Sequence, residues 1–251
     1  MLIEQSAYTN RWHLVSPAAK GTFCLSGMVA AYAASMPGAA SGVALVLSAV
    51  TILGAGIPPM RYLRVAAPAL LFLAVSALSL AVSLKIGDSV GDVSLQLARA
   101  ELHRAAHVCG RSLGALAALL FLAMTTPLSD IIALLRRCKV PEVLLDIMTL
   151  GYRTLFVLSE AVHDTLTAQS ARLGYATVRI SMRSLGGLVA NLTIQIWQRS
   201  QALHMAAMAR NNDGPLRFLE HEYANSRRDM YFAIIGGATL VGLTMLYPWS
   251  N

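Results

Sequence analysis

Charged residues are scarce in this chain of 251 residues. Asp, Glu, Lys and Arg make up 13% of the sequence and hydrophobic residues 56%, whereas a soluble domain carries about 25% charged residues. This composition excludes a free soluble domain, because most of the surface of such a chain must avoid water. Forty consecutive residues between Lys20 and Arg61 contain no Asp, Glu, Lys, Arg or His. The sequence therefore predicts a membrane protein.

Cysteine is also rare, and a nucleotide-binding motif is missing. Cys24 and Cys109 fall in or beside apolar stretches and Cys138 follows two arginines, so we expect free thiols and neither a disulfide framework nor a zinc site. No Gly-x-x-x-x-Gly-Lys-Ser/Thr loop occurs, and the chain alone cannot hydrolyse ATP by that route. We expect no catalytic residues, no cofactor and no bound metal, and any energy from ATP must come from a partner.

The uncharged stretches have the lengths of membrane spans. About 20 apolar residues cross a bilayer as a helix, and the stretch after Lys20 is interrupted at Met36-Pro37-Gly38. It therefore predicts two spanning helices joined by a tight turn. Further uncharged stretches of nearly spanning length lie at 66–84, 112–129 and 230–248. We expect an all-α integral membrane protein with about five transmembrane helices.

The positive charges predict the orientation of these spans. Arg11 and Lys20 precede the first span, and Arg61 and Arg64 separate the second from the third. Short loops rich in Lys and Arg face the cytoplasm, so the N-terminus is expected to be cytoplasmic, in the inner membrane of a bacterium. The segment 85–100 is then expected outside. The basic excess also favours anionic lipid of the bilayer as a partner, and we expect no nucleic acid.

A long charged segment separates the fourth predicted span from the last. It holds twelve of the twenty Lys and Arg residues, and its apolar stretches are too short to span. We expect long amphipathic cytoplasmic helices here, at about 142–171 and 181–210, the first opened by Pro141. The chain is accordingly divided into three parts: an N-terminal membrane domain of four spans at 1–127, a cytoplasmic coupling-helix region at 128–228, and a C-terminal transmembrane helix at 229–251.

A five-residue pattern, Ala-x-x-Ala-Arg, closes both of these long helices. In each copy the alanines lie three residues apart on one face, which permits close helix packing, and the arginine ends the helix where its charge favours the C-terminal dipole. An arginine at a rigid helix tip can dock in a groove of a partner, and two tips would suit two copies of that partner. On composition alone, the favoured interpretation is that the two arginines only cap their helices, because a five-residue pattern arises easily in an alanine-rich chain. The residues of the two copies are Ala168, Ala171 and Arg172, and Ala206, Ala209 and Arg210.

The chain resembles the transmembrane T components of energy-coupling-factor ABC transporters, over most of its length. The resemblance is carried by four segments and the two arginine signatures: Ala7-Tyr8-Thr9-Asn10-Arg11, Ser16-Pro17-Ala18-Ala19-Lys20, Met124-Thr125-Thr126-Pro127 and Leu150-Gly151-Tyr152-Arg153. The first two look like the CbiQ branch, which serves cobalt import. The resemblance implies that Arg172 and Arg210 dock on two ABC ATPase subunits. It also implies a substrate-binding integral membrane S component, CbiM-like, with or without a small CbiN-like subunit.

Both signatures depart from the family pattern of Ala-Arg-Gly or Ala-Arg-Ser. The first reads Ala171-Arg172-Leu173-Gly174, with the glycine one place late, and the second reads Ala209-Arg210-Asn211, with no glycine. Asn can adopt the left-handed conformation that Gly would supply after a helix. Both departures retain the arginine, and the resemblance implies that the ATPase-docking residues are Ala171, Arg172, Gly174, Ala209 and Arg210; Ala168 and Ala206 are expected to pack the helices.

Other functions remain open on sequence grounds. His103 and His107 lie four residues apart near Glu101 and could present two metal ligands, although no third ligand is obvious. Asp88 and Asp92 are the nearest approach to the metal-binding aspartates of a lipid or prenyl-phosphate transferase. An ion-coupled carrier would need ionisable residues inside the spans, and the predicted spans have none. The cargo of a T component could also be nickel or a vitamin such as biotin.

Overall fold

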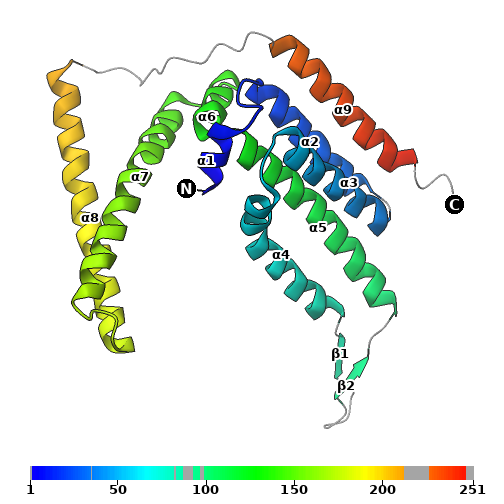
Figure 1. Cartoon of the computed structure of the whole chain (residues 1–251), viewed down its shortest axis with the longest axis horizontal. Helices are drawn as coiled ribbons and strands as arrows, with labels where there is room; N and C mark the ends of the chain where they lie inside the picture. Colours follow the sequence, from blue (N-terminus) through cyan, green and yellow to red (C-terminus); the bar gives the residue numbers. More distant parts are fainter. Residues whose placement is uncertain are drawn as a thin grey trace. The chain divides into compact units, whose positions relative to one another are not determined.

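The structure is a computed structural model, and it falls into two compact units (Figure 1). The first unit comprises Met1–Leu134 and His221–Asn251, and the second comprises Leu135–Glu220. Each unit is described here by itself. The structure describes residues 2–34, 36–81, 83–86, 93–96, 99–211 and 226–246.

Helices make up nearly all of the first unit. Its elements in chain order are α1 (Leu2–Thr9), α2 (Pro17–Ala33), α3 (Pro37–Ala49), the π-helical turn η1 (Val50–Gly54), α4 (Pro59–Ala81), β1 (Ser83–Ile86), β2 (Val93–Gln96), α5 (Arg99–Thr125) and α9 (Ser226–Leu246). Helix α6 (Leu128–Arg137) continues from this unit into the second. The strands form a short antiparallel hairpin in which Ser83 pairs with Gln96. The sequence did not predict this hairpin.

Proline residues mark the starts of several helices, as their fixed φ and missing N–H favour the first helical turn. Pro17 follows Ser16, whose hydroxyl oxygen accepts a hydrogen bond from the Ala19 N–H. Helix α2 ends before Ala34 and α3 begins at Pro37. The predicted break between two helices thus falls between Ala34 and Pro37, since Pro37 and Gly38 already belong to α3; Ser35 lies outside the described residues.

Four helices in the described part of the chain are long and apolar enough to cross a membrane: Pro37–Gly54, Pro59–Ser79, Ala105–Thr125 and Ser226–Leu246. The fifth predicted span corresponds to α2, which has 17 residues and stands at the short end of the spanning range, about 17–25 residues. The predicted all-α membrane fold is confirmed.

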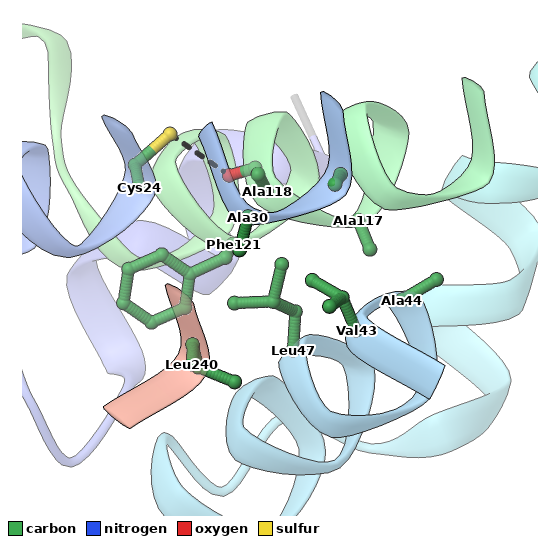
Figure 2. Packing of buried hydrophobic residues seen from close by; sticks show 10 residues of the cluster. Cys24, Ala30, Val43, Ala44, Leu47, Ala117, Ala118, Phe121 and Leu240 are labelled. Carbon is green, nitrogen blue, oxygen red and sulfur yellow. Dashed lines mark hydrogen bonds between the residues drawn. The ribbon is translucent and has the colours of Figure 1, made fainter. Parts of the chain in front are cut away.

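Small residues allow the helices of the first unit to pack closely. Leu47 of α3 and Phe121 of α5 are buried among alanines of α2 and α5 (Figure 2). A Cβ added to Gly114 would lie 2.5 Å from the Cβ of Ala31, so α5 and α2 touch through their backbones. Cys24 donates a hydrogen bond from its thiol to the Ala118 carbonyl oxygen, 3.2 Å away. Close backbone approach through small residues is the usual packing mode of membrane helices.

The second unit contains two long helices, α7 (Glu142–Ala171) and α8 (Val178–Ala209). They lie antiparallel to each other and are joined by a turn (Figure 1). Both had been predicted from the sequence; α8 begins three residues earlier than expected, because the Thr177 side chain accepts a hydrogen bond from the Ile180 N–H and so caps its N-terminus. Pro141 precedes α7, as predicted.

Candidate coupling-helix tips

Arg172 is the C-cap residue of α7 and directly follows Ala171, the last residue of the helix. Its φ and ψ are −95° and 16°, and the next residue, Leu173, has a φ of 59°. The Gly174 N–H donates to the Gln169 carbonyl oxygen at 2.8 Å and the Leu173 N–H donates to the Ser170 carbonyl oxygen at 3.0 Å. These two bonds form a Schellman motif, which satisfies the last carbonyls of a helix. Leu173 therefore takes the left-handed position usually filled by glycine.

Arg210 holds the same position at the end of α8. Its φ and ψ are −98° and 8°. Asn211 follows with a φ of 49°, and its N–H donates to the Met208 carbonyl oxygen at 3.0 Å. The expectation that this asparagine adopts the left-handed conformation is confirmed. The two Ala-x-x-Ala-Arg copies thus end their helices with matching backbone geometry.

The turn after Arg172 is fixed by side chains from both helices. Gln169 of α7 donates to the Ser184 carbonyl oxygen of α8 at 3.0 Å and accepts a hydrogen bond from the Tyr175 hydroxyl at 2.6 Å. The Ser184 hydroxyl donates to the Gly174 carbonyl oxygen at 2.8 Å. A Cβ added to Gly174 would lie 2.8 Å from the Gln169 carbonyl oxygen. The glycine one place late in the signature is therefore the residue that permits this close approach.

Both tips are exposed to solvent in the second unit. The guanidinium groups of Arg172 and Arg210 make no hydrogen bond or ion pair with the residues that the structure describes. Apolar side chains stand beside them, with Leu173 74% exposed and Met208 60% exposed. The four alanines of the two signatures are exposed as well: Ala168, Ala171, Ala206 and Ala209. The helix packing expected of Ala168 and Ala206 thus has no partner in the described part of this chain.

The two arginines lie at opposite ends of one helix. Arg172 is separated from the start of α8 by the five residues of the turn, and Arg210 caps the other end of that 32-residue helix. At 1.5 Å per residue, α8 is about 48 Å long. A single partner groove cannot receive both arginines at this separation, so the geometry favours two separate docking sites.

A second group of polar residues was not recognised from the sequence. Lys20 is 2% exposed and donates from Nζ to the Thr125 carbonyl oxygen at 2.9 Å. The side-chain amide of Asn10 lies 3.2 Å from the same oxygen. Lys20 had served to predict orientation and, like Asn10, had been named among the segments that carry the family resemblance, but neither residue had been assigned a role.

The other candidate ligands named from the sequence do not form a metal site within the described residues. Those residues contain no group of three or more His, Cys, Asp or Glu side chains that could hold a metal ion. His107 is half-buried on α5. Asp88 and Asp92, and the side chains of Glu101 and His103, lie outside the described residues.

The long apolar helices of the first unit and the paired helices of the second define a multi-pass, all-α membrane protein. The profile of the CbiQ family, described as "Cobalt transport protein", matches residues 9–220. The chain therefore belongs to the CbiQ cobalt transport protein family.

Three relatives give the extent of the similarity. The cobalt transport protein CbiQ of Rhodobacter capsulatus is 35% identical over 228 residues, which cover 89% of each chain. A fused cobalt transport protein CbiMQ of Methanocorpusculum labreanum is 26% identical over 88% of this chain and 38% of its own length. An uncharacterized protein of Methanocaldococcus jannaschii is 40% identical over 111 residues, and the match covers 44% of this chain and 41% of that protein.

Proposed function

We propose that this chain is the transmembrane coupling subunit of an energy-coupling-factor ABC importer for cobalt. In this role it catalyses no reaction. It transmits the conformational change of two ABC ATPase subunits to a substrate-binding membrane subunit. The observation that carries the proposal is the matching pair of exposed arginine tips at the two ends of α8.

Arg172 and Arg210 are the residues that we assign to the ATPase contact, with Ala171, Gly174 and Ala209 shaping the tips. An arginine without a partner among the described residues keeps its forked donors available for carbonyl or carboxylate groups of another protein. Alanine beside the arginine keeps the backbone accessible, since no large side chain covers it. The exposed Leu173 and Met208 would supply apolar contact around each charge.

The substrate-binding subunit is assigned to the apolar surface of the long helices. Val178 and Trp197 of α8 are 83% and 67% exposed, and Val143 of α7 is 72% exposed. Large exposed apolar surface marks contact with protein or lipid. A relative carries CbiM and CbiQ in one fused chain, which supports a CbiM-like membrane subunit as the neighbour of this protein. We place the N-terminus in the cytoplasm of a bacterial cell, on the basis of the basic residues between the spans.

The test is a mild-detergent co-purification from cells that express the whole transporter. With the unchanged chain, two ATPase subunits and a second multi-span protein should co-purify, and the complex should hydrolyse ATP. In the Arg172→Glu plus Arg210→Glu variant, the ATPases should be lost, because each reversed charge removes an anchor worth about 2 kcal/mol or more, roughly thirtyfold in affinity.

Arg199→Glu is the matched control, because Arg199 is an exposed arginine of α8 away from both tips. It should retain the ATPases and cobalt uptake. If the double variant kept both ATPases and transported cobalt normally, the docking role would be lost. If the unchanged chain were recovered alone and stable, the coupling function itself would be wrong.

A further inference from the structure

Two side chains from the N-terminal segment hold the C-terminal end of α5. Lys20 Nζ lies 2.9 Å from the Thr125 carbonyl oxygen. The Asn10 amide nitrogen lies 3.2 Å from that oxygen and 3.4 Å from the Met124 carbonyl oxygen. These carbonyls belong to the last turn of α5, whose orphan acceptors need partners and whose negative dipole end favours a cation. Lys20 and Asn10 therefore cap α5 from another part of the chain.

The start of α9 is tied to the same segment. Asp229, in the first turn of α9, accepts a hydrogen bond from the backbone N–H of Ser16 at 3.2 Å. Ser16 is the N-cap of α2, and Lys20 follows one turn later. We call Asn10, Ser16, Lys20, Thr125 and Asp229 the polar joint. It connects the end of α5 and the beginning of α9 through the first turn of α2.

The position of the polar joint along the chain is informative. The chain leaves the first unit after Leu134, shortly beyond Thr125, and returns to it at His221, shortly before Asp229. The first unit is therefore linked to the coupling helices by only two covalent connections. Thr125 of the polar joint precedes the first connection in the chain, and Asp229 follows the second.

The charge at the centre of the polar joint is deeply buried. Lys20 is 2% exposed, and an ammonium group is rarely removed from water unless hydrogen bonds or opposite charges compensate it. The carboxylates whose charge acts on it are Asp130 of α6 and Asp229 of α9. Asp130 and Asp229 therefore belong to α6, which leads into the second unit, and to α9, which follows it in the chain. A movement of either element changes the electrostatic environment of Lys20 directly.

A cavity gives the polar joint room to change. It has a volume of about 380 Å³ and lies beside Lys20 and Asp229, with the remaining lining formed largely by aromatic and aliphatic side chains, among them Trp12, Phe121 and Phe232. Closely packed interiors resist continuous deformation, whereas free volume beside a polar contact allows side chains to adopt a second arrangement.

We propose that Lys20 and Asn10 are positioning residues that transmit the movement of the coupling helices to the membrane helices. When the coupling helices move, α6 and α9 shift with them. The ammonium group of Lys20 is attracted by Asp130 and Asp229 and is hydrogen-bonded to the Thr125 carbonyl oxygen, so a shift of the carboxylates moves α2 and α5 together. This inference rests on the proposed coupling function. It adds to that function the site in the first unit, the polar joint, that receives the movement of the coupling helices.

The experiment measures coupling separately from assembly. Lys20→Met keeps most of the apolar stem of the side chain and removes the charge. We expect the ATPase subunits to co-purify with this variant. In the complete transporter reconstituted into lipid vesicles, ATP should still be hydrolysed, while uptake of radioactive cobalt per ATP hydrolysed falls by about tenfold, the order of a typical coupling between sites. Lys20→Arg, which retains a cation and donors, should restore part of this ratio.

Cys24→Ala is the matched control. Cys24 lies in the core, one turn of α2 after Lys20, and its thiol also donates a hydrogen bond to a backbone carbonyl of α5, that of Ala118. This variant should lose some thermal stability and keep its ratio of uptake to hydrolysis. If Cys24→Ala lowers the ratio as much as Lys20→Met, the lysine has only a structural role and the inference is overturned.

A second substitution, Asn10→Ala, tests the inference independently in case Lys20→Met does not fold. Asn10→Ala removes the neutral partner of the same Thr125 carbonyl and should lower the ratio by a smaller factor with ATPase subunits still bound. A normal ratio in Asn10→Ala, or in a folded Lys20→Met, would also overturn the inference. Retention of the ATPases by the Arg172→Glu plus Arg210→Glu variant would overturn only the proposed docking function, whereas a normal ratio of uptake to hydrolysis in the Lys20 and Asn10 variants would overturn only this inference.

Discussion

Gly174 is the residue whose substitution should most affect the tip of α7. A methyl group there would lie 2.8 Å from the Gln169 carbonyl oxygen and 2.9 Å from the Ser184 hydroxyl. Gly174→Ala should therefore displace the turn, lower the thermal stability of the complex and reduce the ATPase recovered with it. Strain at such a backbone contact costs about 1–3 kcal/mol.

Gly187→Ala is the control for this substitution. Gly187 lies in α8, and an added Cβ there meets nothing within 4 Å. Replacing glycine by alanine inside a helix gains about 1 kcal/mol, so this variant should be as stable as the unchanged chain or more so. A stable Gly174→Ala complex with full ATPase binding would show that the turn does not position Arg172.

The two helix ends also show what sequence can predict for single residues. Asn211 was expected in the left-handed region because asparagine tolerates it. Leu173 was not, since a residue with a Cβ pays roughly 1–2 kcal/mol there, and only the hydrogen bonds of the turn reveal why it is accepted. Lys20 was missed for a related reason: a lysine at the edge of an apolar stretch is equally consistent with a solvated side chain, and its burial depends on α5, which is distant in sequence.

At the scale of helices, prediction succeeded where length and proline signals were strong. The turn at Pro37, the start of α7 after Pro141 and the end of α8 at Arg210 all follow from local chemistry. The start of α5 was not predicted. The sequence predicted a span at 112–129, because charged residues lie between Arg99 and Arg111, whereas the helix begins at Arg99. Gly110, near Arg111, packs closely against Pro37 and Ala40 of α3, a contact that no local pattern of the sequence reveals.

The apolar surface of α8 leads to a prediction for the element as a whole. Trp197 is 67% exposed, so Trp197→Gln should change the free energy of unfolding by no more than about 0.5 kcal/mol. If this surface contacts the substrate-binding subunit, the same substitution should cost about 2 kcal/mol or more of binding. Co-purification should then lose the multi-span partner and keep the ATPases.

Gln195→Ala provides the comparison on the same helix. Gln195 is exposed and lies two positions earlier, about 200° around the helix from Trp197. It should retain every partner. Equal recovery of the multi-span partner with Trp197→Gln would mean that this face of α8 contacts lipid or nothing at all.

For the whole molecule, the natural cysteines allow a direct test of orientation. Cys138 is exposed and Cys24 is buried, so a membrane-impermeant maleimide should react chiefly with Cys138 in a chain carrying Cys109→Ser. Because an accessible thiol reacts as its thiolate, labelling is followed at mildly alkaline pH. We expect labelling in inside-out vesicles and none in intact cells. Labelling from outside the cell would place the coupling helices on the wrong side for cytoplasmic ATPases.

The position of one arginine signature at each end of α8 has a consequence for the evolution of the chain. The number of residues in α8 sets the distance between Arg172 and Arg210 and the direction in which Arg210 points relative to Arg172. Deleting seven residues would shorten the helix by about 10 Å and leave Arg210 facing almost the same way. Deleting two would shorten it by only about 3 Å and turn Arg210 by about 200°. If the proposed docking on two ATPase subunits holds, the length of α8 can therefore change only by whole turns, and only together with the spacing of those subunits.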